Sequence, residues 1–150
     1  MPFSELQLRI ALTMIPEIGP ITAKNLIHHL GSVNAIFHES PEKLRRIRGI
    51  GPRLSASVAS TRLLDEAGRE EEFIARHHIS VSYYKDPDYP RRLKECADGP
   101  ILLYSRGRAC LNAERILSVV GTRRATCYGK EACRNLIRGV ADMYGEVVIV

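Results

Sequence analysis

Two arginines beside a glycine are the residues of this sequence best suited to binding an anion. The stretch "SVVGTRRATCYGKEAC" (residues 118–133) passes from apolar residues to Gly121, Thr122, Arg123 and Arg124, and then to Gly129. This order is typical of a strand, a turn and the start of a helix. N–H groups at a helix start and the planar guanidinium of arginine both bind phosphate oxygens. The stretch therefore predicts a phosphate site.

The spacing of its glycines does not match the loops that bind nucleotide cofactors. A dinucleotide fingerprint requires G-x-G-x-x-G, whereas the six residues from Gly121 read G-T-R-R-A-T. A Walker A loop ends in G-K-[ST], whereas Gly129-Lys130 is followed by Glu131. We therefore expect no cofactor. Two interpretations of the arginines remain. They contact the phosphate backbone of a nucleic acid, or they are ordinary turn residues exposed to solvent.

A second basic group lies in the first third of the chain. Five basic residues occur within eleven positions that contain no acid: Lys43, Arg45, Arg46, Arg48 and Arg53. They surround the G-x-G-P turn Gly49-Ile50-Gly51-Pro52. We interpret Gly49, Gly51, Arg48 and Arg53 as an auxiliary phosphate contact, because glycine allows a tight turn and the helix after it begins with unpaired N–H groups. A purely packing role, with an ordinary solvated basic face, is the alternative.

The same turn occurs earlier in the chain with different side chains. The segments "IPEIGPITA" (15–23) and "IRGIGPRLS" (47–55) share I-x-x-I-G-P, with Gly19 and Gly51 32 residues apart. Two such turns between short helices predict two helix-hairpin-helix units packed on each other. The first copy has Glu17 at the glycine position and Ile21 at the basic position. Because a carboxylate repels phosphate, we expect Gly19 to be mainly structural.

The elements that position these turns follow from helix caps and hydrophobic periodicity. Helices are expected after the capping box Ser4–Gln7, from Pro20 to a cap at Gly31, and after Ser40-Pro41. A long helical stretch covers residues 53–79, with Gly68 as a candidate kink or break. Strands are expected at 79–84, 101–104, 115–121 and 146–150, the last two as buried strands around a helix from 129 to 145.

These elements predict an α/β fold class overall. The expected organisation is an all-α tandem helix-hairpin-helix domain at residues 1–70, a connecting region with short strands at 71–110, and the first βαβ unit of a Rossmann-like domain at 111–150. One βαβ unit cannot cover both edges and faces of a central parallel strand. We therefore expect the chain to be the N-terminal piece of a longer protein.

Composition narrows the choice of partners and compartment. The 22 Lys and Arg residues exceed the 17 Asp and Glu residues, and the resulting net charge of +5 favours an anionic partner. No signal peptide or membrane span is recognisable, which predicts a cytoplasmic protein without membrane contact. Four cysteines without a C-x-x-C pair, and histidines only as neighbours or alone, predict reduced thiols and no metal site.

Three segments carry a resemblance to a known family: "DPDYPRRL" (86–93), "DGPILLYSRG" (98–107) and "SVVGTRRATCYG" (118–129). In this order and spacing, after a tandem helical start that resembles SAM-like domains, the chain resembles the DNA processing protein A family (DprA, also called Smf). The resemblance covers essentially the whole chain. It implies that Gly121, Thr122 and Arg123 belong to a phosphate-binding pocket of a Rossmann-like DNA-binding domain.

The resemblance also implies a function. Family members bind single-stranded DNA during natural transformation, protect incoming DNA and help load the RecA recombinase. They are not known as catalysts, so we expect no catalytic residue and no cofactor. The partners implied are single-stranded DNA, RecA and a second subunit, with a homodimer formed through residues beyond this chain.

Two enzyme classes remain as alternatives. A nucleotide phosphoribohydrolase of related Rossmann-like shape would hold a mononucleotide phosphate in the same turn, but it needs a catalytic acid, and the turn contains none. A helix-hairpin-helix DNA-repair protein would need a lysine–aspartate pair or a metal-binding acid cluster. The one close pair of aspartates, Asp86 and Asp88, lies in a proline-rich linker, where we expect turn residues.

Overall fold

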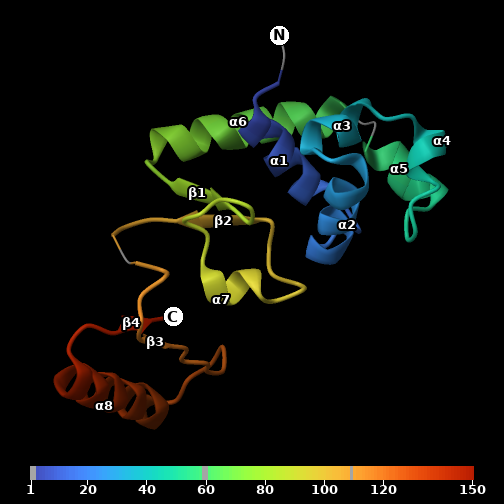
Figure 1. Ribbon diagram of the computed structural model, residues 1–150. Helices are drawn as coiled ribbons and strands as arrows, with labels where there is room; N and C mark the ends of the chain where they lie inside the picture. The colour runs from blue at the N-terminus through green and yellow to red at the C-terminus, as the bar shows by residue number, and fades with distance from the viewer. Residues whose placement is uncertain (1–2, 59–60, 109) are drawn as a thin grey trace. The chain divides into compact units, whose positions relative to one another are not determined.

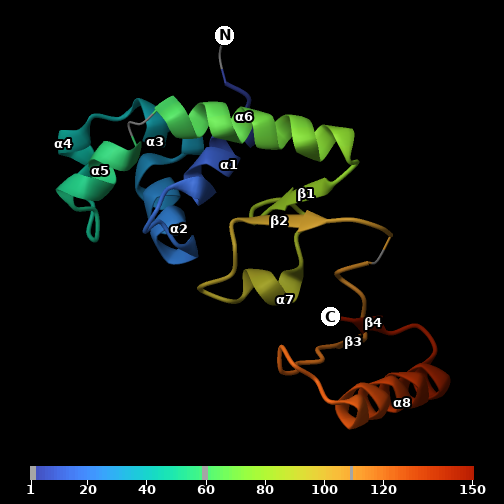
Figure 2. The ribbon, with the colours of Figure 1, turned by 180° about the vertical axis from the view of Figure 1, so that it is seen from behind.

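The computed structural model describes residues 3–58, 61–108 and 110–150 (Figures 1 and 2). The chain divides into two compact units, Met1–Arg106 and Gly107–Val150, and each is described by itself. The predicted domain limits near residues 70 and 110 stay a prediction. Within the described residues, no helix is both long enough and apolar enough to cross a membrane.

Six helices begin the first unit in the part of it that the structure describes. They are α1 (Glu5–Met14), α2 (Pro20–Leu30), α3 (Val33–His38), α4 (Pro41–Leu44), α5 (Pro52–Val58) and α6 (Thr61–Arg76). The predicted caps are confirmed at three helix ends: Ser4 Oγ accepts a hydrogen bond from Gln7 N (2.9 Å), Gly31 ends α2 with φ +83°, and Ser40 Oγ accepts one from Lys43 N. These local bonds explain why such short helices form where they do. The Gln7 side chain bonds to the carbonyl of Leu64 in place of completing the predicted capping box with Ser4.

The repeated segments supply the core of this helical part. Ile15 and Ile18 of the first hairpin are at most 7% exposed, and so are their counterparts Ile47 and Ile50 in the second. The apolar positions of the I-x-x-I-G-P pattern therefore point inward in both copies, as a tandem helix-hairpin-helix unit requires. The residues between them are left at the surface, where each turn meets solvent.

Gly68 has a different role from the one expected. Helix α6 continues through it without a break, contrary to the sequence expectation. A Cβ atom at position 68 would lie 2.9 Å from Nε2 of Gln7, which donates a hydrogen bond to the carbonyl of Leu64 (2.8 Å). The glycine thus allows α1 to pack closely against α6, and Ser4 Oγ adds a bond to the carboxylate of Glu71 (2.7 Å).

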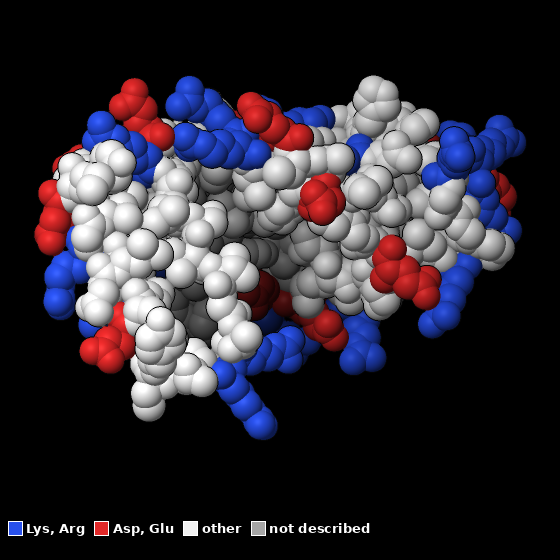
Figure 3. Space-filling model, turned by 90° about the horizontal axis from the view of Figure 1, so that it is seen from below, with Lys and Arg blue, Asp and Glu red and all other residues white. Residues whose placement is uncertain are grey.

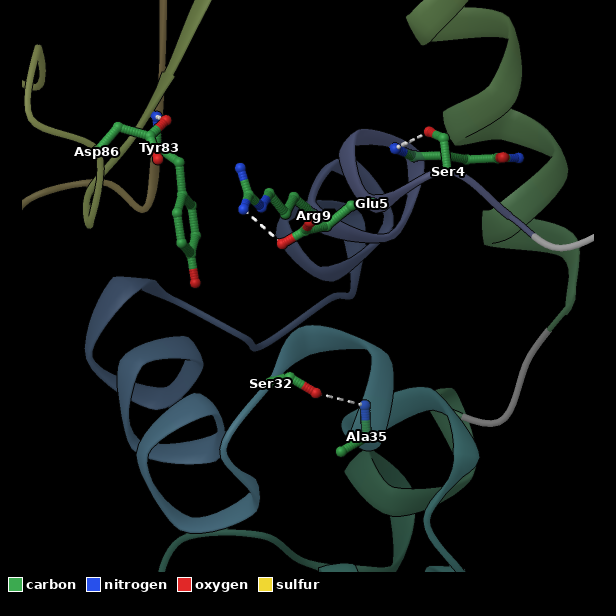
Figure 4. Close-up of polar contacts among 8 residues, drawn as sticks. Ser4, Glu5, Arg9, Ser32, Ala35, Tyr83 and Asp86 are labelled. Carbon is green, nitrogen blue, oxygen red and sulfur yellow. Dashed lines mark hydrogen bonds and ion pairs between the residues drawn. The ribbon is translucent and has the colours of Figure 1, made fainter.

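The first unit also contains a two-stranded antiparallel sheet. Strand β1 (Ser80–Tyr83) pairs with β2 (Leu102–Ser105), and the short helix α7 (Arg91–Lys94) lies between them in the chain. The sheet is tied to the helices by side chains. The guanidinium of Arg9 lies 3.8 Å from the centre of the Tyr83 ring. Figure 4 shows the Arg9 side chain extending toward this ring. Lys24 Nζ donates to the carbonyls of Cys96 and Ala97.

The second unit is a βαβ arrangement. Strands β3 (Ile116–Leu117) and β4 (Val148–Ile149) pair in parallel, and α8 (Cys127–Tyr144) connects them. The α/β class with a helix-hairpin-helix part is therefore confirmed, while a Rossmann-like domain stays a prediction. Both strands are shorter than expected and only partly buried. The helix begins at Cys127, two residues before Gly129, because the hydroxyl of Thr126 caps it.

Candidate nucleic-acid interface

The turn of the second hairpin depends on one glycine in a left-handed conformation. Gly49 has φ +91°, which residues with a side chain rarely adopt. After the turn, Ser55 is fully buried and its hydroxyl donates to the carbonyl of Pro52 (2.9 Å). Arg45 Nε donates to the same hydroxyl (3.3 Å), so a residue before the turn is tied to the helix that follows it.

The basic residues around this turn are exposed but differ in their contacts. Lys43 is paired with Glu39 (3.3 Å), whose pKa is lowered mainly by a hydrogen bond from the backbone N–H of Ser40. Arg46 and Arg48 make no ion pair or side-chain hydrogen bond with any described residue. The predicted contact residues Gly49, Gly51, Arg48 and Arg53 thus lie together at one exposed turn, with Arg48 available to an anion.

Arg53 is paired with the other hairpin. Its Nη1 lies 3.5 Å from Oε1 of Glu17, and both side chains are mostly exposed. Glu17 has φ +69° and occupies the position that corresponds to Gly49, so the two turns share a left-handed residue at the same place. The ion pair brings the two turns side by side and sets a carboxylate next to the predicted phosphate contact.

The first hairpin turn faces the sheet of its own unit. Gly19 and Pro20 line a cavity of about 220 Å³ together with residues of the β2 segment, among them Leu102 and Tyr104. The neighbouring Ile21 is 60% exposed and has no group that could donate to phosphate. The first turn therefore offers a phosphate an apolar side chain and a carboxylate.

The glycine–threonine–arginine turn of the second unit is exposed at the start of α8. Gly121, Thr122 and Arg124 line a depression of about 770 Å³, whereas Arg123 is not among the residues that line it. The Thr126 hydroxyl accepts a hydrogen bond from Gly129 N (3.1 Å) and so fixes the first turn of the helix beside them. The structure thus brings the predicted residues to one exposed turn, with Arg124 facing the hollow.

Two basic residues that line this depression were not predicted from the sequence. Lys130 and Arg134 line it from one face of α8, and both are exposed. Their spacing of four residues is the signal that could have found them, because such residues lie on the same side of a helix. With Arg124 they supply three positive charges around one hollow, and no Asp or Glu is among its lining residues.

In the described part of the chain, the aspartate pair and the cysteines do not form a metal site. Asp86 Oδ2 accepts a hydrogen bond from Tyr83 N (2.9 Å), and Asp88 Oδ2 accepts one from the Ser82 hydroxyl (3.2 Å), which are roles of turn residues. The four cysteines are free thiols. No group of three or more His, Cys, Asp or Glu residues within the described ranges could hold a metal ion.

Basic and acidic side chains alternate over the face of the molecule drawn in Figure 3. No continuous basic surface is visible on that face. Local groups of arginine and lysine are suited to individual phosphates of a chain.

The fold and these turns define a class of protein: a tandem helix-hairpin-helix unit followed by an α/β unit, each with an exposed basic turn. Residues 8–65 match the helix-hairpin-helix motif, and residues 80–150 match the family described as DNA recombination-mediator protein A. This match and the relatives named DprA and Smf support the family assignment that the sequence predicted.

Individual relatives agree with both matches. A protein named "Putative DNA processing protein DprA" from Mycobacterium tuberculosis is 28% identical over 69% of this chain and 30% of its own length. "Protein Smf" from Synechocystis is 25% identical over 85% of this chain and 33% of its own length. "UvrABC system protein C" from Pseudarthrobacter chlorophenolicus is 40% identical over 50 residues, which are 33% of this chain and 7% of that protein. The chain thus spans about a third of the length of its DprA and Smf relatives.

Proposed function

We propose that this protein binds single-stranded DNA in the cytoplasm during natural transformation, protects the incoming strand and helps to load RecA, without being an enzyme. Family membership supports a role in DNA processing and recombination. The observation that carries the binding proposal is the depression beside Thr122, where Arg124, Lys130 and Arg134 surround one hollow. Guanidinium and ammonium groups there are suited to a phosphate backbone and do not read base identity.

The experiment compares three arginine variants of the full-length protein. Arg123→Ala and Arg124→Ala test the predicted turn. Arg138→Ala is the control, because Arg138 is exposed on α8, lies outside the predicted turn and does not line the depression. Each turn variant is expected to weaken binding of oligonucleotides of different sequence by a similar factor. The slope of log affinity against log salt should fall by about 0.7 for each phosphate that the variant no longer binds.

The control gives the result a clear interpretation. If Arg138→Ala leaves the affinity and the slope unchanged while a turn variant lowers both, the turn contacts phosphate. Unchanged affinity and slope in Arg123→Ala and Arg124→Ala would remove the turn from the binding site.

We propose that the protein is not a nucleotide phosphoribohydrolase, although that class would also use a phosphate-binding turn. Such an enzyme needs a carboxylate close to the nucleotide, and none lines the depression in the described structure. Release of free base from nucleoside monophosphates by the full-length protein would contradict this proposal.

The further partners are proposals that follow from family membership. We propose a homodimer, formed outside the surfaces described above, and a contact with RecA. Sedimentation of the full-length protein measures the first. The rate at which RecA assembles on a single strand coated with a single-strand-binding protein measures the second, and the full-length protein should raise it.

A further inference from the structure

The two hairpins have the same turn geometry but opposite chemistry at two positions. Glu17 and Gly49 both have positive φ, +69° and +91°, so both turns have a left-handed residue at the corresponding position. Four residues later, the first copy has exposed Ile21 where the second has exposed Arg53. The two copies can therefore be compared position by position. Glu17 and Ile21 carry one negative charge, whereas Gly49 and Arg53 carry one positive charge.

Stability does not explain Glu17 at this place. A residue with a side chain is strained at positive φ, where glycine is not. Its partner Arg53 is 87% exposed and Glu17 itself 57% exposed, and an ion pair in such an exposed setting stabilises a fold very little. What Glu17 changes is the local charge: it adds a carboxylate to the first turn and neutralises one arginine of the second.

This difference determines how many DNA backbones the paired turns can hold. A duplex presents two backbones across a minor groove about 6 Å wide, so a face with two basic turns side by side could hold one backbone at each turn. Here the first turn offers Glu17 and Ile21, whereas the second has Arg48, which makes no ion pair with any described residue. Of the two turns, the second therefore presents the arginine that is available to a phosphate.

We propose that Glu17 and Ile21 restrict the helical unit to a single DNA strand, and that the protein therefore discriminates against duplex DNA at this surface. This inference rests on the proposed function, since it presumes that DNA is the ligand. Glu17 and Ile21 would thus determine the selectivity for single-stranded DNA, although their hairpin does not itself contact the DNA.

A reciprocal exchange between the hairpins tests the inference in the full-length protein. The variant Glu17→Gly/Ile21→Arg gives the first turn the pattern of the second, and Gly49→Glu/Arg53→Ile does the reverse. Affinities are measured for an oligonucleotide and for the duplex of the same sequence at several salt concentrations. The first variant should bind duplex about 5- to 10-fold more tightly, as one added charge-assisted phosphate contact would give.

Further readouts separate a selectivity effect from a general gain of charge. Single-strand affinity should rise less than duplex affinity in Glu17→Gly/Ile21→Arg, because the release of Arg53 from Glu17 serves both DNA forms, whereas Ile21→Arg adds a contact for the duplex alone. The duplex salt slope should become steeper by about 0.9 for the contact at position 21. Gly49→Glu/Arg53→Ile should weaken the binding of both DNA forms. Glu17→Gln removes the charge and keeps the shape of the side chain, so a smaller rise in duplex affinity is expected even if the exchanged hairpin folds poorly.

The outcomes distinguish this inference from the proposed function. A wild-type protein that binds DNA, combined with an unchanged ratio of duplex to single-strand affinity in both Glu17→Gly/Ile21→Arg and Glu17→Gln, would overturn the inference alone. An equal rise for both DNA forms would also overturn it. A wild-type protein without affinity for either DNA form would overturn the proposed function as well.

Discussion

Gly49 and Gly51 lie two residues apart in one turn and have different conformational needs. Gly49 has φ +91°, whereas Gly51 has no positive φ, and a Cβ at either position would meet no atom within 4 Å. Any cost of a side chain at 49 therefore comes from the backbone conformation. We predict that Gly49→Ser lowers the free energy of unfolding by about 1–2 kcal/mol.

The same substitution at the neighbouring glycine is the control. Gly51 precedes the helix that begins at Pro52, and serine is a favoured residue at that place, so Gly51→Ser should change stability by less than about 0.5 kcal/mol. Denaturant unfolding measures both variants. Equal destabilisation by the two would show that the positive φ of Gly49 is not what decides which residues this turn accepts.

Tyr83 makes stability depend on alkaline pH. Burial, followed by the neighbouring Tyr84, raises the pKa of the Tyr83 phenol well above its usual range, and burial also raises the pKa of Tyr89 and Tyr104. The folded chain therefore holds these protons more tightly than the unfolded chain, whose tyrosines titrate near pH 10. Stability is unaffected by these groups below about pH 10 and falls above it, by up to about 1.4 kcal/mol per pH unit and group.

Removing the hydroxyl should remove part of this dependence. In Tyr83→Phe the fall in unfolding free energy above about pH 10 should be less steep than in the wild type. Tyr128→Phe is the control, because Tyr128 is 81% exposed. Unfolding curves in denaturant between pH 8 and pH 11 measure the slopes. Identical slopes for wild type and Tyr83→Phe would show that Tyr83 does not contribute.

At the scale of elements, two helix glycines separate helix propensity from packing. Gly139 lies within α8 with open space around it, whereas a Cβ at Gly68 in α6 would press on Gln7. Alanine stabilises an exposed helix interior by about 0.5–1 kcal/mol relative to glycine. We predict that Gly139→Ala gains this amount and that Gly68→Ala does not, because it disturbs the hydrogen bond from Gln7 to Leu64.

A double variant makes this prediction specific. In a Gln7→Ala background the obstacle at position 68 is gone, so Gly68→Ala should recover the gain of about 0.5–1 kcal/mol. Thermal unfolding of the four proteins of the cycle measures it. A Gly68→Ala effect that is independent of residue 7 would contradict close packing of α1 on α6 as the reason for the glycine.

The sequence predicted those elements whose causes are local. The caps at Ser4, Gly31 and Ser40 act within a few residues, and the repeated I-x-x-I-G-P places its own apolar residues in the core, so both could be predicted. The start of α8 was predicted two residues too late, because a glycine was preferred to the capping hydroxyl of Thr126.

What could not be predicted depends on contacts between distant residues. The role of Gly68 is set by Gln7, which comes from another helix, and no local pattern indicates it. The pairing of Arg53 with Glu17 joins residues 36 positions apart. The depression at α8 is a different case, because Lys130 and Arg134 lie four residues apart on one helix, a local spacing that the sequence does show.

At the scale of the whole molecule, the two candidate contacts belong to different compact units. Arg48 lies in the unit Met1–Arg106 and Arg124 in the unit Gly107–Val150. Substitutions at distant sites without shared partners change free energies additively, within about 0.5 kcal/mol. If both turns contact the same DNA, the decreases in binding free energy should add.

We therefore predict that Arg48→Ala and Arg124→Ala each weaken single-strand binding by full-length protein, and that the double variant shows the sum of the two effects. Each substitution should also lower the salt slope by about 0.7, and the double variant by about 1.4. Titrations of labelled oligonucleotide measure the four proteins, with Arg138→Ala as the control for a general decrease in positive charge. A double variant no weaker than Arg124→Ala would mean that the helical unit does not contact the strand held by the α/β unit.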